Sequence, residues 1–118
     1  MKTVLQEILN RLPGVVGAAI VGLDGIPVEK VSAEASFNMD LASAEGIHVV
    51  KRAAAALKGS PGERVQEVSV TGGGSITVMR FLASDYYLCV VAQTGAAIPG
   101  RVRYEAWRAG LHLQAAIG

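Results

Sequence analysis

The strongest constraint on the fold is the uncharged run at residues 86–92, YYLCVVA. A strand exposed on one face alternates between apolar and polar residues, whereas this run is apolar at nearly every position. The pattern therefore predicts a central strand that is covered on both faces. Cys89 lies within the run, and because its neighbours supply no positive charge we expect it to be an inert core residue.

Four more segments have the residue types of strands. Segments 65–71 and 75–83 precede the central run and are separated from each other only by three glycines. Connections this short predict an antiparallel meander. Near the N-terminus, the apolar segments 15–21 and 26–31 flank a Leu-Asp-Gly turn and predict a β-hairpin whose second strand is more exposed.

The first predicted helix covers residues 3–12, where apolar residues recur at spacings of three and four. Thr3 and Gln6 have the spacing of a capping box, in which the two side chains satisfy amide groups that the first helical turn leaves free. Pro13, followed by a glycine, ends this helix.

Two longer helices are predicted further along the chain. The second covers 41–57 and is ended by Gly-Ser-Pro-Gly at 59–62, and three polar residues stand at its start as candidate caps: Ser36, Asn38 and Asp40. Pro99 begins the third helix, which carries one apolar stripe of Val102, Ala106, Ala109, Leu113 and Ile117 and a flanking one of Tyr104, Trp107 and Leu111. The element order α-β-β-α-β-β-β-α predicts one α+β domain spanning 1–118.

The charge balance excludes several classes of partner and suggests another. Eleven basic and ten acidic residues give a net charge of +1 without runs of like charge, so no nucleic-acid or polybasic membrane surface is indicated. A single cysteine, the lack of a signal-peptide core and the lack of ~18 consecutive apolar residues favour a cytoplasmic protein without membrane insertion. Charged residues make up only 18% of the chain, which favours burial of some surface against a second chain.

No pattern in the sequence indicates catalysis. His48 and His112 lack a zinc-ligand spacing and there is no Gly-x-Ser-x-Gly motif, although triad residues that meet only in the fold stay possible. The glycine run at 72–74 continues into a strand instead of the Lys-Ser or Lys-Thr of a phosphate-binding loop, so it predicts a hairpin turn. We therefore expect no catalytic residue, no metal and no cofactor, and the protein is predicted not to be an enzyme.

The helix at 41–57 carries the most information about association. Gly46 lies in its interior at a cost of roughly 1 kcal/mol relative to alanine, which predicts close approach of another backbone, favoured here as the same helix of a second chain. The alternative is a tolerated defect in an alanine-rich helix. The polar positions Glu45, His48, Lys51 and Arg52 are expected to point outward, either as a binding surface or as a solvated helix face.

Two stretches of sequence resemble the Roadblock family, the dynein light-chain type of small regulatory domain. One is LNRLPGVVGAAIVGLDGIPV at 9–28, with its helix, Pro-Gly and Asp-Gly hairpin, and the other is IPGRVRYE at 98–105. Together with the element order, the resemblance covers almost the whole chain. It implies a profilin-like, five-stranded antiparallel sheet with the second helix on one face and the first and third helices on the other.

The resemblance also implies a homodimer, in which the third strands pair and the two second helices lie side by side. The interface residues are then Ala42, Gly46, Ala53, Val65, Val68 and Val70. Bacterial members of the family often bind Ras-like small GTPases and regulate their nucleotide state, and the residues expected to meet the GTPase are Glu45, His48, Lys51 and Arg52. If hydrolysis is stimulated as by a GTPase-activating protein, Arg52 or Arg80 is a candidate arginine finger. The alternatives are a scaffolding adaptor without GTPase contact and a small-ligand sensor.

Overall fold

The computed structural model describes residues 1–58 and 64–117, and its element order confirms the predicted one. The elements are α1 (Lys2–Arg11), β1 (Val15–Gly22), β2 (Pro27–Ser32), α2 (Met39–Ala55), β3 (Glu67–Thr71), β4 (Ser75–Ala83), β5 (Tyr86–Gln93) and α3 (Pro99–Ile117). Every boundary lies within a few residues of the prediction, because glycine, proline and turn residues mark the ends of the apolar segments.

All five strands pair antiparallel in the order β2-β1-β5-β4-β3. β5 occupies the centre, as its uninterrupted apolar sequence predicted. Its side chains alternate between two core clusters, with Leu88, Val90 and Ala92 in one and Tyr87, Cys89 and Val91 in the other. The consequence is a sheet with a hydrophobic layer on each face and two open edges, β2 and β3.

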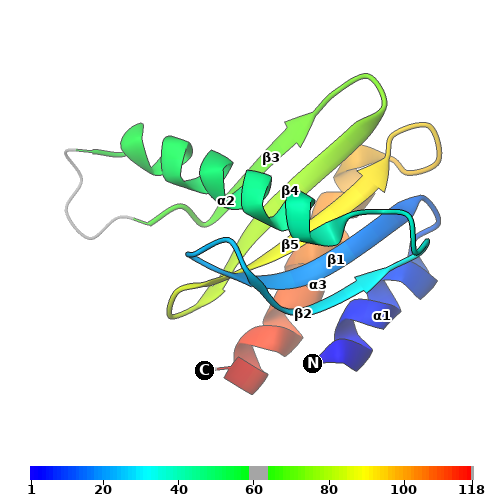
Figure 1. The fold of residues 1–118 in the computed structure, drawn as a ribbon, viewed down its shortest axis with the longest axis horizontal. Coiled ribbons are helices and arrows are strands. Elements are labelled where there is room, and N and C mark those ends of the chain that lie inside the picture. The colour runs from blue at the N-terminus through cyan, green and yellow to red at the C-terminus, as the bar shows by residue number, and fades with distance from the viewer. Residues whose placement is uncertain (59–63, 118) are drawn as a thin grey trace.

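The helices cover opposite faces of the sheet, as Figure 1 shows with α2 in front and α1 and α3 behind. The face under α1 and α3 is packed by buried residues of both helices, including Leu5, Ile8, Val102 and Leu113. The face under α2 is packed mainly through Met39, Ile47 and Val50, which meet residues of β1, β4 and β5. Because one helix covers the α2 face and two cover the other, the α2 face is the less completely covered.

The helix ends show one correct and one wrong capping prediction. Asn38 caps α2 as expected, since its side-chain oxygen accepts a hydrogen bond from the amide of Leu41 at 3.0 Å. The capping box of α1 is wrong, because the helix begins at Lys2 with Met1 at the N-cap, which places Thr3 inside the first turn. The predicted stop signal of α2 at 59–62 lies outside the described residues.

Candidate interaction surface formed by α2 and β3

The outer edge of β3 is open, and the strand carries one charged residue, Glu67, at its start. β3 pairs only with β4, and its five residues, EVSVT, include no proline and no lysine. Val68 and Val70 both point to the α2 face, and Val70 is 51% exposed. An exposed edge strand with apolar residues is a template for pairing with another chain.

The opposite edge, β2, is protected. It begins with Pro27, which donates no backbone hydrogen bond, and carries Lys30 near its middle. Lys30 Nζ also reaches across to α2 and binds both carboxylate oxygens of Asp40, at 2.7 and 2.8 Å. Only β3 therefore combines an open edge with apolar residues and no such block.

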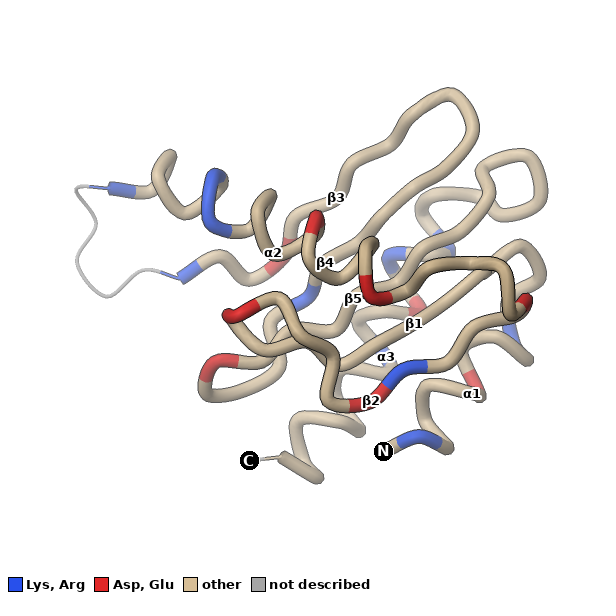
Figure 2. Tube along the Cα trace, viewed as in Figure 1, with Lys and Arg blue, Asp and Glu red and all other residues tan. Residues whose placement is uncertain are grey.

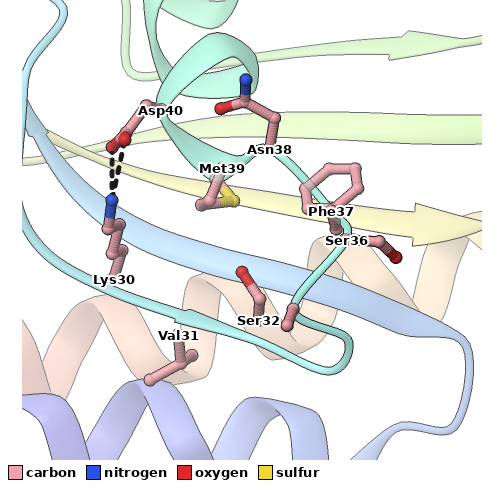
Figure 3. A pocket seen from close by; sticks show the side chains of 9 residues that line it. Lys30, Val31, Ser32, Ser36, Phe37, Asn38, Met39 and Asp40 are labelled. Atoms are coloured by element: carbon pink, nitrogen blue, oxygen red, sulfur yellow. Dashed lines mark hydrogen bonds and ion pairs between the residues drawn. The ribbon is translucent and has the colours of Figure 1, made fainter.

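A pocket of about 540 Å³ lies beside β2, where the strand leads through a loop into α2 (Figure 3). Its polar lining includes Lys30, Ser32, Ser36, Asn38 and Asp40. The two charged groups of this lining are bound to each other, and Asn38 already caps α2. Because these groups are satisfied within the protein, the pocket offers few convergent groups to a ligand.

A smaller groove of about 190 Å³ runs between α2 and the strands β3 and β4. We call it the α2–β3 groove, and it is lined by Ala42, Glu45, Gly46, Val49, Val68, Val70, Thr77 and Met79. Most of this lining is small or apolar, and the groove opens directly beside the free edge of β3. An edge strand and an apolar groove thus form one continuous surface.

Gly46 has a close neighbour within its own chain. A Cβ atom at this position would lie 2.6 Å from Sδ of Met79, which is buried under α2 in the same chain. Met79 therefore fills the space above the glycine within this chain, and close approach of a second chain's helix stays a prediction. Gly46 lets α2 sit close to β4, which shapes the floor of the α2–β3 groove.

The structure brings together four of the six residues predicted for a dimer interface, namely Ala42, Gly46, Val68 and Val70, all in the α2–β3 groove. Ala53 is half-buried further along α2. Val65 precedes β3 and is buried in the core, where its carbonyl accepts a hydrogen bond from the Tyr87 hydroxyl at 2.7 Å. Its side chain is therefore packed within this chain, and its place in a dimer interface stays a prediction.

Sequence reasoning missed Val49, Thr77 and Met79 of the α2–β3 groove. Val49 is one helical turn after Gly46, so the helical period could have placed it on the same face. Thr77 lies opposite Val70 in the sheet, and only the strand register shows that the two residues are neighbours.

The predicted charged positions on α2 form an exposed row along the helix, which we call the charged row: Glu45, His48, Lys51 and Arg52. Acidic residues lie in the first half of α2 and basic residues in the second, as Figure 2 shows. None of the four is ion-paired within residues 1–58 and 64–117. Arg80, the other candidate arginine finger, instead pairs with Glu67 at 3.4 Å on the face covered by α3.

Two buried titratable side chains, Cys89 and Tyr87, pack within the core. Cys89 is fully buried, as predicted for a core residue, and burial raises the pKa of its thiol to about 12. Burial also raises the pKa of Tyr87, whose hydroxyl is bound to a backbone carbonyl. His48 and His112 are exposed on helices that cover opposite faces. Among the residues that the structure describes, no three His, Cys, Asp or Glu side chains gather as a metal site.

Within the described ranges, the helices are too short or too polar to cross a bilayer. No protein-family model and no curated protein matches the sequence.

Solved structures, in contrast, match the fold over nearly the whole chain. A Roadblock/LC7 domain from Streptomyces avermitilis has a TM-score of 0.84 at 16% identity, covering 99% of this chain and 97% of that one. MglC from Myxococcus xanthus has a TM-score of 0.69 at 27% identity, covering 97% and 96%. MglB in a tetrameric arrangement has a TM-score of 0.83 at 19% identity, covering 96% and 84%.

Proposed function

We propose, on the premise that this chain has the Roadblock/LC7 fold, that it is a non-catalytic regulator which acts as a homodimer on a Ras-like small GTPase. The regulator would modulate the nucleotide state of the GTPase and would need no cofactor of its own. One observation carries the proposal: the single unprotected sheet edge of the described chain lies beside an apolar groove. Both features are suited to a second copy of the same surface.

The dimer would form by antiparallel pairing of β3 with β3 of the partner across a two-fold axis. Such an arrangement is isologous, so each residue of the edge meets the same surface on the other subunit. Pairing would satisfy the free backbone groups of β3 and cover Val70. It would also set the two copies of α2 beside each other and close the α2–β3 groove. The tetrameric arrangement of MglB supports the expectation that chains of this fold associate.

The GTPase would then bind over the paired α2 helices through the charged row. Because the dimer places two such rows on one surface, it offers a platform that a monomer lacks. Exposed charges at an interface mainly change the association rate and the choice of partner. Arg52 is the better-placed candidate to stabilise charge on the nucleotide, since it is exposed whereas Arg80 is held by Glu67.

The first experiment measures mass by light scattering while the protein is diluted through the micromolar range. A dimer that dissociates on dilution supports the proposed association. A mass that stays monomeric at every concentration contradicts it. The measurement needs no knowledge of the GTPase.

The second experiment tests the partner. Purified Ras-like GTPases from the same host are mixed with the protein, and GTP hydrolysis, nucleotide release and binding kinetics are followed. The double variant Lys51→Glu, Arg52→Glu should bind more slowly and with a changed salt dependence, while the matched control Lys2→Glu on α1 should bind as the wild type does. If no GTPase binds a protein that is dimeric, the GTPase proposal is contradicted, and the scaffolding adaptor becomes the favoured alternative. Equal binding by the double variant would contradict the charged row as the contact surface.

A further inference from the structure

A second exposed surface lies on the outer side of α3, on the face of the sheet opposite α2 (Figure 1). Tyr104, Trp107 and Leu111 are 54%, 43% and 52% exposed, although they are among the largest apolar side chains of the protein. Their spacings of three and four place them on one side of the helix, away from its buried stripe. We call this line of side chains the α3 ridge, and it extends for about 10 Å, or two helical turns.

The α3 ridge is pre-organised for contact. The rings of Tyr104 and Trp107 pack against each other with centroids 5.8 Å apart and planes inclined by 40°. Aromatic side chains with few rotatable bonds lose little conformational entropy when they bind, and Trp, Tyr and Arg are the residues that most often dominate interface energies. The ridge therefore has the composition of a binding site, whereas scattered exposed apolar residues would need no explanation.

Arginines flank the α3 ridge. α3 contains Arg101, Arg103 and Arg108, and its one acidic residue, Glu105, is buried. Glu105 accepts hydrogen bonds from Arg108 at 3.0 Å and from Arg11 of α1 at 3.1 and 3.2 Å. Two arginines thus meet one carboxylate, and the cluster keeps a positive charge that Glu7 of α1 partly offsets.

The same excess of positive charge occurs on the other flank. Glu67 of β3 binds Arg103 at 2.8 Å and Arg80 at 3.4 Å, so again one carboxylate serves two arginines. Arg101 is exposed and makes no ion pair with any residue of the described chain. The α3 ridge is consequently an apolar line between basic flanks, and its complement is an apolar line between acidic flanks.

From this complementarity we propose that the α3 ridge binds an acidic amphipathic helix of a partner protein. The partner would place apolar side chains at spacings of three and four on the ridge and aspartates or glutamates against the arginines, which bind carboxylates in a planar, two-point geometry. A second copy of this chain is disfavoured because its α3 carries the same positive charge. An anionic membrane is disfavoured because each flank holds a carboxylate, Glu105 or Glu67, among its arginines, whereas lipid-binding segments are clusters of 4–8 Lys or Arg.

Trp107 is the only tryptophan of the chain, so its fluorescence reports directly on the α3 ridge. The probe is a stapled helical peptide without tryptophan or tyrosine, with leucines at spacings of three and four and glutamates on both flanks. The control peptide has lysine in place of each glutamate. Titration of the full chain with the glutamate peptide should shift the Trp107 emission to shorter wavelength with saturation, and the lysine peptide should not.

The matched variants separate the ridge from other exposed apolar residues. Tyr104→Ser with Leu111→Ser should weaken peptide binding by about tenfold or more, while Ile26→Ser with Val28→Ser, equally exposed on the hairpin, should leave it unchanged. Arg101→Glu should weaken binding and reduce its salt dependence.

Three outcomes would overturn the proposal. The first is equal binding of the two peptides. The second is a Trp107 shift with phosphatidylserine vesicles but not with the glutamate peptide, and the third is a concentration-dependent shift without any peptide, which would indicate self-association through α3. The ridge lies opposite α2, so each result stands whether or not the protein regulates a GTPase.

Discussion

The contact between Gly46 and Met79 predicts that Gly46→Ala lowers the free energy of unfolding when Met79 is present and raises it when Met79 is replaced by alanine. A Cβ atom added at Gly46 would lie 2.6 Å from Sδ and 3.2 Å from Cε of Met79, closer than side-chain carbons approach without displacement. Met79 is only 1% exposed and belongs to the core cluster under α2, so it has little room to move. Gly46→Ala therefore forces either the methionine or the helix to shift.

Two effects of Gly46→Ala oppose each other. Alanine stabilises a helix interior by roughly 1 kcal/mol relative to glycine, whereas an extra methyl group in a well-packed core typically costs about 1–3 kcal/mol. The free energy of unfolding should therefore fall by up to about 2 kcal/mol. Met79→Ala alone should lower it by about 2–5 kcal/mol through loss of buried volume. In that background the clash is gone, so Gly46→Ala should raise the free energy of unfolding by up to about 1 kcal/mol.

The assay is a double-mutant cycle by urea denaturation, with far-ultraviolet circular dichroism at one fixed protein concentration. The matched control is Gly100→Ala in α3, where an added Cβ meets no atom within 4 Å. Its effect on stability should not depend on Met79. The reasoning is refuted if Gly46→Ala stabilises the protein in both backgrounds. If Gly46→Ala leaves the free energy of unfolding unchanged but weakens self-association, the glycine contacts a second chain.

Three further predictions concern the sheet edge and the interior. Val70→Lys on β3 should convert the proposed dimer to monomer in sedimentation experiments, whereas Val28→Lys on the protected β2 edge should not, and equal effects would contradict the proposed β3 pairing. Because burial raises the pKa of Cys89 to about 12, the free energy of unfolding should fall as pH rises above about 9, where the unfolded thiol ionises first, and Cys89→Ala should remove this slope. Burial tends to raise the pKa of Glu105, but hydrogen bonds from Arg11 and from Arg108 on its own helix lower it below 4.5. The carboxylate therefore stabilises the fold at neutral pH, and this contribution is lost as pH falls through the folded pKa. Glu105→Gln should flatten the acid unfolding curve, and an unchanged curve would show that the interactions of Glu105 with the two arginines contribute nothing to stability.

The sequence by itself determined the types and order of the elements. Apolar periodicity distinguishes helix from strand, and Pro13, Asn38 and Pro99 mark helix ends through their own backbone chemistry. The central place of β5 followed from its composition, because only a strand covered on both faces can be apolar throughout. These features depend on a residue and its near neighbours, which a linear pattern contains.

The open edge of β3 was only partly foreseeable. The resemblance to the Roadblock family predicted residues 65–71 as the pairing strand, and the structure places Val68 and Val70 on the edge strand β3. The burial of Val65 before the start of β3 was not foreseen, because alternation in a strand does not reveal where the pairing begins. Val65 packs in the core cluster under α2, and its carbonyl accepts a hydrogen bond from the Tyr87 hydroxyl of β5.

Tertiary structure alone decided what fills the space at Gly46 and where the charges of α3 are held. The helical period puts Gly46 on the small face of α2, yet the atom that occupies its missing side chain comes from Met79 on β4. Arg11 and Glu105 are 94 residues apart in sequence, and their ion pair exists because α1 and α3 pack side by side. Local pattern fixes which side of an element is apolar, whereas the partner of each side chain depends on contacts between distant segments that only the packed chain brings together.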